Sequence, residues 1–173
     1  MAAIQDRMLR AAKLDVQLYE EVEHDEGALR QATTVVVLSA VAAGIGSLGI
    51  GGLAGLVSGT LAALFGWYIW AFLTYFIGTR LLPEPQTRAD YGELLRTIGF
   101  ASAPGLIRVL GIIPGLGQIV FAVAGVWMLI ATVIAVRQAL DYTNTWRAVG
   151  VCAIGWVVQS VILMVAFAMF GAG

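Results

Sequence analysis

Residues 31–79 read QATTVVVLSAVAAGIGSLGIGGLAGLVSGTLAALFGWYIWAFLTYFIGT and contain no Asp, Glu, Lys, Arg or His. As one α-helix this stretch would be more than twice as long as the roughly 30 Å hydrocarbon core of a bilayer is thick. It therefore predicts two membrane-spanning helices joined by a turn. Five glycines near its middle, where helix propensity is low, mark that turn: Gly44, Gly46, Gly49, Gly51 and Gly52.

The rest of the chain extends this pattern to an all-α, polytopic membrane bundle of five spans. The first two spans are predicted at 33–48 and 52–78. Three more apolar segments follow, at 91–113, 118–136 and 148–170. Only 12% of the residues are charged, against about 25% in ordinary soluble domains. This composition supports a membrane protein.

The segment 91–113 decides the topology, because it contains Arg96 and Arg108 and its crossing is open from composition alone. If it crosses, nine of the ten basic residues lie on one side of the membrane, and only Arg108 leans outward. The positive-inside rule favours this arrangement. We predict five spans with a cytoplasmic N-terminus and an outside C-terminus.

Residues 1–30 are predicted to form a cytoplasmic amphipathic helical segment, ahead of a membrane domain at 31–173. Leu14, Leu18 and Val22 recur at helical spacing, and Asp15 is a candidate helix cap. The segment is polar and acidic, so we expect no cleavable signal peptide. Its seven acidic and four basic residues give a net charge of −3. This charge favours a protein surface over anionic lipid as its target.

Two faces of the second span are candidate packing or partner surfaces. One is a ridge of small residues that recur every four positions: Gly51, Gly55 and Gly59. The other is an aromatic stripe: Phe65, Tyr68, Phe72 and Tyr75. We interpret both first as packing within the bundle. The alternatives are a homodimer along the ridge, and a lipid, a pigment or a partner helix on the stripe.

A break in the third span is a candidate functional feature. Pro104 and Gly105 interrupt the helix just before Arg108. A charge inside a span is costly and marks a functional hypothesis, and broken helices form substrate sites in some transporters. The competing interpretation, which we favour, is that Arg108 snorkels to the outer headgroups.

Other features exclude several classes of function. The only histidine, His24, precedes the first span, so no span offers an axial haem ligand. The only cysteine, Cys152, lies in an apolar segment and excludes a disulfide framework or a Cys metal cluster. The net charge of −1 gives no general attraction for nucleic acid. We predict no enzyme activity, no cofactor, no metal site and no nucleic-acid partner.

The connection between the last two spans is a candidate cytoplasmic site, marked by Arg137, Asp141 and Arg147. Arg137 and Asp141 can pair if the helix continues to residue 141. We expect the N-terminal helices to fold across this end of the bundle, or onto a partner, near residues 79–90 and 137–147.

The second half of the chain resembles a known family. The matching segments are YGELLR at 91–96, GFASAP at 99–104, GIIP at 111–114 and AVRQALDYTNTWRAV at 135–149. They are similar to the Yip domain family, five-span membrane proteins whose eukaryotic members interact with Rab-type GTPases in vesicle traffic. The compact N-terminus, without a long tail, resembles prokaryotic members. The resemblance implies a five-span fold with a Pro-broken third span.

Together these features predict a non-enzymatic integral membrane scaffold or adaptor that binds other integral membrane proteins, as an accessory subunit of a larger complex. Membrane lipid and a second copy of the chain are further expected partners. The alternative is a small-solute or ion transporter built around Pro104, Gly105 and Arg108.

Overall fold

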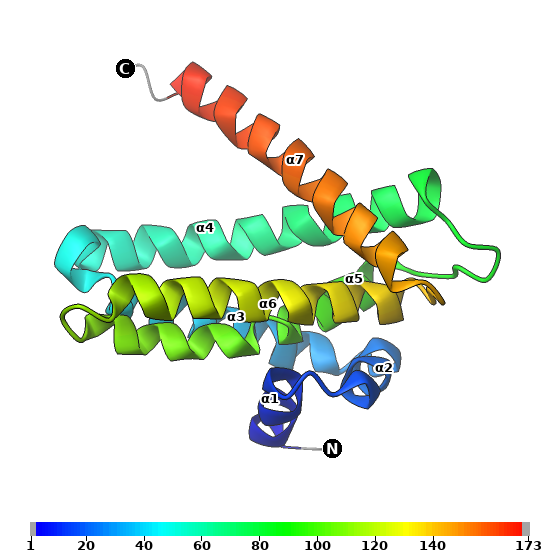
Figure 1. Ribbon diagram of the computed structural model, residues 1–173, viewed down its shortest axis with the longest axis horizontal. Helices are drawn as coiled ribbons and strands as arrows, with labels where there is room; N and C mark the ends of the chain where they lie inside the picture. The colour runs from blue at the N-terminus through cyan, green and yellow to red at the C-terminus, as the bar shows by residue number, and fades with distance from the viewer. Residues whose placement is uncertain (1–2, 171–173) are drawn as a thin grey trace.

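The computed structural model describes residues 3–170, which are almost entirely helical (Figure 1). Two short helices come first, α1 (Ile4–Ala12) and α2 (Val16–His24). The Asp15 side chain accepts a hydrogen bond from the backbone N–H of Gln17 and caps α2, as predicted. The N-terminal segment is therefore a pair of helices.

Five long helical segments follow, and each is long and apolar enough to cross a membrane. The all-α, five-span prediction is confirmed. The first two are α3 (Ala28–Gly46) and α4 (Leu48–Phe76), which continues into the π-helical turn η1 (Ile77–Leu81). The third combines α5 (Tyr91–Phe100) with the 3₁₀-helix η2 (Ala103–Ile112). The last two are α6 (Gly117–Ala139) and α7 (Thr145–Phe170).

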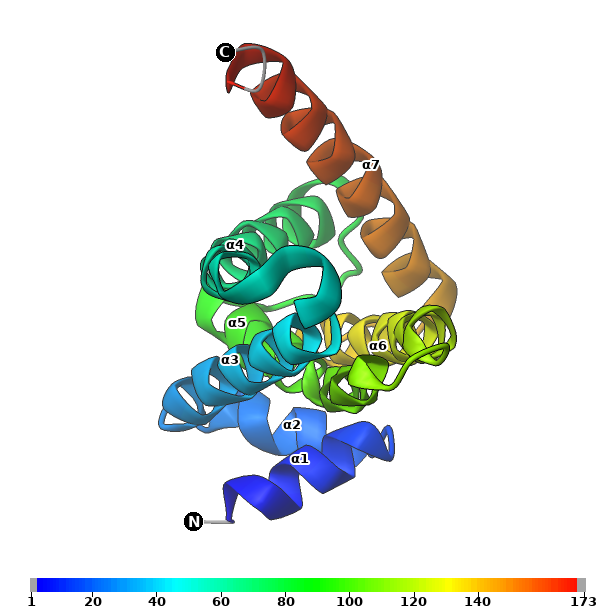
Figure 2. The same cartoon turned by 90° about the vertical axis from the view of Figure 1, so that its left-hand side faces the viewer.

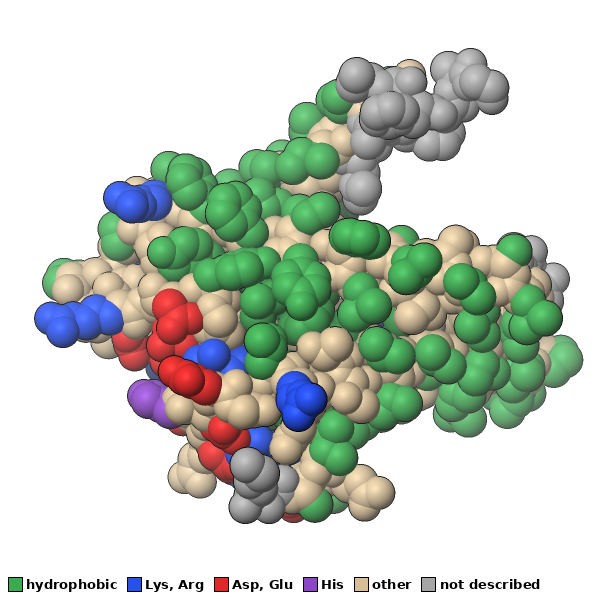
Figure 3. Space-filling view, turned by 180° about the vertical axis from the view of Figure 1, so that it is seen from behind, with side chains coloured by type: hydrophobic (Ala, Val, Ile, Leu, Met, Phe, Trp, Pro, Cys, Tyr) green, Lys and Arg blue, Asp and Glu red, His purple; other side chains and the backbone are tan. Residues whose placement is uncertain are grey.

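The spans form a bundle with a helix or helix pair on either side. α3, α5–η2 and α6 lie together, with α4 on one side and the α1–α2 pair on the other (Figures 1 and 2). α7 leaves the bundle at an angle. We call the end with the 82–90 connection and the 140–144 turn the connection end, and the other the glycine-turn end. On the face in Figure 3, charged side chains gather around the connection end and the N-terminal helices, and most of the remainder is hydrophobic.

The reversal between the first two spans consists of Ser47 and the first residues of α4, up to a kink at Gly52. Gly52 has a non-helical φ of 57° and ψ of −164°, and the segment long and apolar enough to cross the membrane begins at this residue, as predicted. A positive φ favours glycine, which has no Cβ to clash. The glycines therefore shape a reversal that ends at the Gly52 kink.

The third span changes helix type at its proline. Asp90 and Glu93 form a capping box that starts α5. Pro104 lies in the first turn of η2, where its missing N–H removes no helical hydrogen bond. Because a 3₁₀-helix has three residues per turn, side chains three positions apart in η2 lie above one another.

The N-terminal helices pack against the bundle towards the connection end. Leu18, Tyr19 and Val22 of α2 are completely buried where this helix packs against α5 and α6. Leu94 of α5 and Leu140, just after α6, are also completely buried. The N-terminal helices are therefore part of the hydrophobic core.

Candidate functional site

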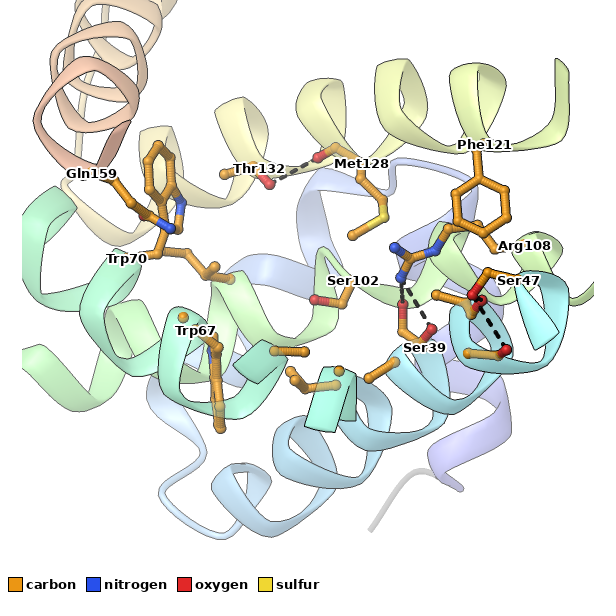
Figure 4. A pocket seen from close by; sticks show the side chains of 18 of the residues that line it. Ser39, Ser47, Trp67, Trp70, Ser102, Arg108, Phe121, Met128, Thr132 and Gln159 are labelled. Carbon is orange, nitrogen blue, oxygen red and sulfur yellow. Dashed lines mark hydrogen bonds between the residues drawn. The ribbon is translucent and has the colours of Figure 1, made fainter. Parts of the chain in front are cut away.

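Residues of all five spans line a partly open cavity of about 570 Å³, shown in Figure 4. Polar side chains from four spans line it: Ser39, Ser47, Ser102, Arg108, Thr132, Gln159 and Ser160. Three tryptophans from α4 and α7 also contribute: Trp67, Trp70 and Trp156. The cavity is a partly polar chamber inside an otherwise apolar bundle.

Arg108 points into this chamber. Its Nη2 donates hydrogen bonds to the backbone oxygen and the Oγ of Ser39, at 3.0 and 2.7 Å, and its Nε donates to the Gly105 carbonyl at 3.0 Å. Arg108 stacks over Gly105 because the two are three residues apart in a 3₁₀-helix. The snorkelling interpretation does not describe this side chain, whose guanidinium turns inward to α3 (Figure 4).

Gly105 provides the room for this arrangement. A Cβ at residue 105 would overlap Ser39 Oγ and would lie 2.7 Å from Arg108 Nη2 and 2.8 Å from Met128 Sδ. Pro104, beside it, is completely buried. The structure therefore brings the three predicted residues of the break together with Ser39, which sequence reasoning missed.

Gln159 of α7 is a second polar group at the chamber. Its Oε1 is buried and has no hydrogen-bond partner among the residues that the structure describes. A buried amide oxygen without a partner carries a desolvation cost. The chamber is therefore lined by an amide side chain on α7 and a cation on η2.

The small-residue ridge of α4 is a wall of the same chamber. Gly55 and Gly59 line it, and a Cβ at either residue would meet no heavy atom of the described chain within 4 Å. We interpreted the ridge as a surface that packs against another helix of the bundle. In the described structure no neighbouring backbone lies close to these two glycines. The surroundings of Gly51 lie outside the described residues. The small residues therefore keep the chamber wide.

The aromatic stripe lies on the outside of α4. Phe65 is 68% exposed, and Tyr68 and Phe72 are also exposed. Tyr75 and Phe72 make edge-on contacts with Tyr91 of α5. The stripe is therefore packed at its connection end and open towards the middle of the span.

The predicted cytoplasmic turn is fixed to the 82–90 connection. Glu84 accepts hydrogen bonds from the backbone N–H and the hydroxyl of Thr143, at 3.0 and 2.8 Å, and forms an ion pair with Arg147 at 3.3 Å. The Thr143 amide is the main reason that the pKa of Glu84 is lowered. The Tyr142 hydroxyl contacts the Gly78 and Leu82 carbonyls, at 2.9 and 2.7 Å.

The predicted pairing of Arg137 with Asp141 does not occur among the described ion pairs. α6 ends at Ala139, and Asp141 has φ 53°. Arg137 instead donates from Nε to the Tyr142 carbonyl at 3.1 Å. The chain turns before the four-residue spacing can bring the two charges together.

Arg96 anchors α2 to the third span. It is only 7% exposed, and it donates from Nε to the Val22 carbonyl at 3.0 Å and from Nη2 to the Glu23 carbonyl. These carbonyls belong to the last turn of α2, which lacks helical partners and favours a cation. Sequence reasoning counted Arg96 only as a topology signal, and nothing in the sequence links it to residues more than 70 positions earlier.

Arg7 makes the corresponding contact between the N-terminal helices. Its Nη2 lies 2.7 Å from Glu21 Oε1 and 2.8 Å from Asp25 Oδ2, and its Nη1 donates to Gln31 of α3 at 3.1 Å. Hydrogen bonds from arginine lower the pKa of Glu21 and of Asp25. Arg7 and Arg96 together hold α1 and α2 against the bundle.

A comparison with known families is consistent with this architecture. The Yip1 domain matches residues 16–167, which extend from α2 almost to the end of α7. The chain belongs to the Yip1 domain family. The resemblance seen in the sequence is confirmed, and members of this family are membrane proteins that interact with other proteins. No curated protein and no solved structure matches the chain.

The Yip1 domain carries one buried acid on α2. Glu23 is 4% exposed, and its Oε2 has no hydrogen-bond partner in the described part of the chain. Burial, and then repulsion from Glu93, raises the pKa of Glu23 to about 8. Donor atoms of Glu20, Glu23 and His24 all lie within 4.8 Å of one another, so these side chains are the group that could hold a cation.

A polar hollow of about 560 Å³ lies at the connection end of the Yip1 domain. Its walls come from α2, the 82–90 connection, and the last turn of α6 with the turn that follows. The lining residues are Glu20, Gln86, Arg137, Gln138, Asp141, Tyr142 and Thr143. Gln138 donates to Glu20, and Gln86 donates to the Asp141 carbonyl at 3.1 Å. Three segments distant in sequence thus form one continuous surface.

Proposed function

We propose that this Yip1-family protein is a non-enzymatic membrane adaptor that binds other integral membrane proteins at its connection end, as an accessory subunit of a larger complex. The observation that carries the proposal is the polar hollow, whose three walls are held together by hydrogen bonds. A surface that is already ordered binds a partner without a further entropic cost of ordering loops. The exposed acids Glu20 and Asp141 give the hollow charges for choosing a partner.

The adaptor proposal predicts that charge changes in the hollow release the partner. In the double variant Glu20→Arg, Asp141→Asn, both changes are at exposed positions, and asparagine tolerates the positive φ of residue 141. We expect the five spans to insert normally while co-purifying membrane proteins fall by at least about tenfold. Quantitative mass spectrometry of mild-detergent preparations measures this loss.

The matched control is Glu26→Arg, Asp6→Asn, which makes the same change in net charge at exposed residues outside the hollow. It should retain the partner at the wild-type level. Full retention of every co-purifying subunit by the hollow variant would show that the partner binds elsewhere.

We also propose that the connection end is cytoplasmic, because nine of the ten basic residues then lie inside. A reporter tag fused before residue 1, or inserted within 83–89, should be protected in intact cells. A tag fused after residue 173 should be accessible from outside. A protected C-terminal tag would contradict the odd number of crossings.

A further inference from the structure

We propose that the interior chamber binds the anionic headgroup of a membrane phospholipid, with its phosphate at Arg108 and an acyl chain in the groove between α6 and α7. The ligand is thus an anionic amphiphile from the bilayer.

The first argument is the uncompensated charge of Arg108. No carboxylate lines the chamber, and Arg108 takes part in none of the ion pairs of the described residues. Its Nε and Nη2 are held by Gly105 and Ser39, whereas Nη1 makes no hydrogen bond within the described chain. A cation inside a span is costly without a counter-charge. Arginine forms strong charge-assisted hydrogen bonds with phosphate. Nη1 of Arg108 is available to donate such a bond to a phosphate oxygen.

The second argument is the room around that nitrogen. Figure 4 shows the Arg108 guanidinium facing the space bounded by Ser102 and Met128. The α4 wall includes several small residues, and Gly55 and Gly59 leave the chamber unfilled. Hydroxyl groups of Ser39 and Ser102 are further hydrogen-bonding partners for a polar headgroup.

The third argument is an apolar groove of about 640 Å³ next to the chamber. α6 and α7 form this groove, and its lining is aliphatic apart from Thr145, Cys152 and Trp156. Trp156 is a wall of both the groove and the chamber. A polar chamber that adjoins an apolar groove matches a ligand with a charged head and a hydrocarbon tail.

The order of these features along the bundle also fits a lipid. Arg108 lies four residues before the end of η2 at Ile112. At the rise of a 3₁₀-helix its backbone is about 8 Å from the glycine-turn end, and its guanidinium turns back to the level of Gly105, about 14 Å from that end. The apolar groove runs from Trp156 towards Thr145 at the connection end. A lipid that enters from the glycine-turn side would place its headgroup near Arg108 and its tail deeper in the bilayer.

The test measures contact between lipid and tryptophan in the purified full chain in nanodiscs. Lipids brominated on the acyl chain quench nearby tryptophans, and Trp156 is a wall of the groove that would hold this chain. At equal mole fraction, brominated phosphatidylglycerol should quench with a roughly fivefold higher relative affinity than brominated phosphatidylcholine, on the scale of one basic residue. Equal quenching by the two lipids in the wild-type protein would overturn the proposal.

Two variants assign the preference to Arg108. Arg108→Gln should abolish it, whereas Arg108→Lys, which keeps the charge, should keep most of it. The matched control Arg80→Gln removes an exposed arginine at the end of η1 and should leave the preference unchanged. A folded Arg108→Gln protein that still prefers phosphatidylglycerol would refute the assignment.

A competition experiment distinguishes the lipid from a free anion. Added inorganic phosphate should not relieve the quenching. If it does, the chamber takes a small soluble anion, as the transporter alternative predicts, and the lipid proposal is wrong. The measurement needs no partner protein, and the variant Glu20→Arg, Asp141→Asn should keep its lipid preference. Failure of this proposal is therefore separable from failure of the adaptor proposal.

Discussion

Replacing Gly46 by alanine should lower the melting temperature of the purified protein by roughly 5–10 °C. Gly46 ends α3 where this helix packs against the backbone of η2. A Cβ there would overlap the Arg108 carbonyl oxygen and would lie 3.0 Å from its carbonyl carbon. Backbone atoms cannot rotate away, so α3 and η2 must separate. Overpacking of this kind costs about 2–3 kcal/mol, which corresponds to a shift of this size.

The matched control is Gly59→Ala, because a Cβ at residue 59 meets open space in the described structure. Its melting temperature should stay at or slightly above the wild-type value, since alanine has the higher helix propensity. Intrinsic tryptophan fluorescence during heating in detergent measures both variants. A wild-type melting curve for Gly46→Ala would show that α3 and η2 are not in close backbone contact.

Replacing Arg96 by methionine should release α1 and α2 from the bundle while leaving the spans in place. The change removes two charge-assisted hydrogen bonds to the last turn of α2 and leaves the Val22 and Glu23 carbonyls without these donors. We expect the docked state to lose about 3 kcal/mol. The undocked fraction then rises roughly a hundredfold.

Limited trypsin digestion in nanodiscs measures this release, because Arg10 and Lys13 lie in the N-terminal pair. Cleavage at these residues should accelerate on the same scale as the undocked fraction. The control Arg88→Met removes an exposed arginine from the 82–90 connection and should be cleaved at the wild-type rate. Unchanged cleavage of Arg96→Met would mean that apolar packing alone holds α2.

The sequence predicted the architecture well because the bilayer leaves few choices. A charge-free stretch as long as residues 31–79 must cross twice, and backbone groups in hydrocarbon must be helical. The glycine-rich turn was also placed correctly, because the second membrane-length segment begins at Gly52. The sequence did not show that residues 48–51 are themselves helical.

The candidate site was only partly predictable. Pro104, Gly105 and Arg108 were identified as a unit, but the direction of Arg108 depends on η2 being a 3₁₀-helix. In an α-helix, with 3.6 residues per turn, Arg108 would not lie directly over Gly105. It does so in a 3₁₀-helix, which has three residues per turn. Ser39, its partner on α3, lies 69 residues away, and no local pattern connects the two.

The cytoplasmic turn shows the same limit. The spacing of Arg137 and Asp141 predicts a pair only within a continuous helix, and the helix stops at Ala139. The energy of such an exposed pair is only about 0.5 kcal/mol. Tertiary contacts of Tyr142 and Thr143 with the 78–84 region are stronger, and these contacts determine the path of the chain.

The contact between Arg96 and α2 can form only after the third span has been synthesised. Arg96 follows Val22 by 74 residues, so at ribosomal speeds of about 5–20 residues per second α2 waits roughly 4–15 seconds for its anchor. Throughout that interval Leu18, Tyr19 and Val22 have no third span to cover them. The apolar face of the nascent N-terminal segment therefore stays uncovered until α5, and then α6, against which α2 also packs, have been synthesised. Complete docking of α2 requires that four of the five spans have been made.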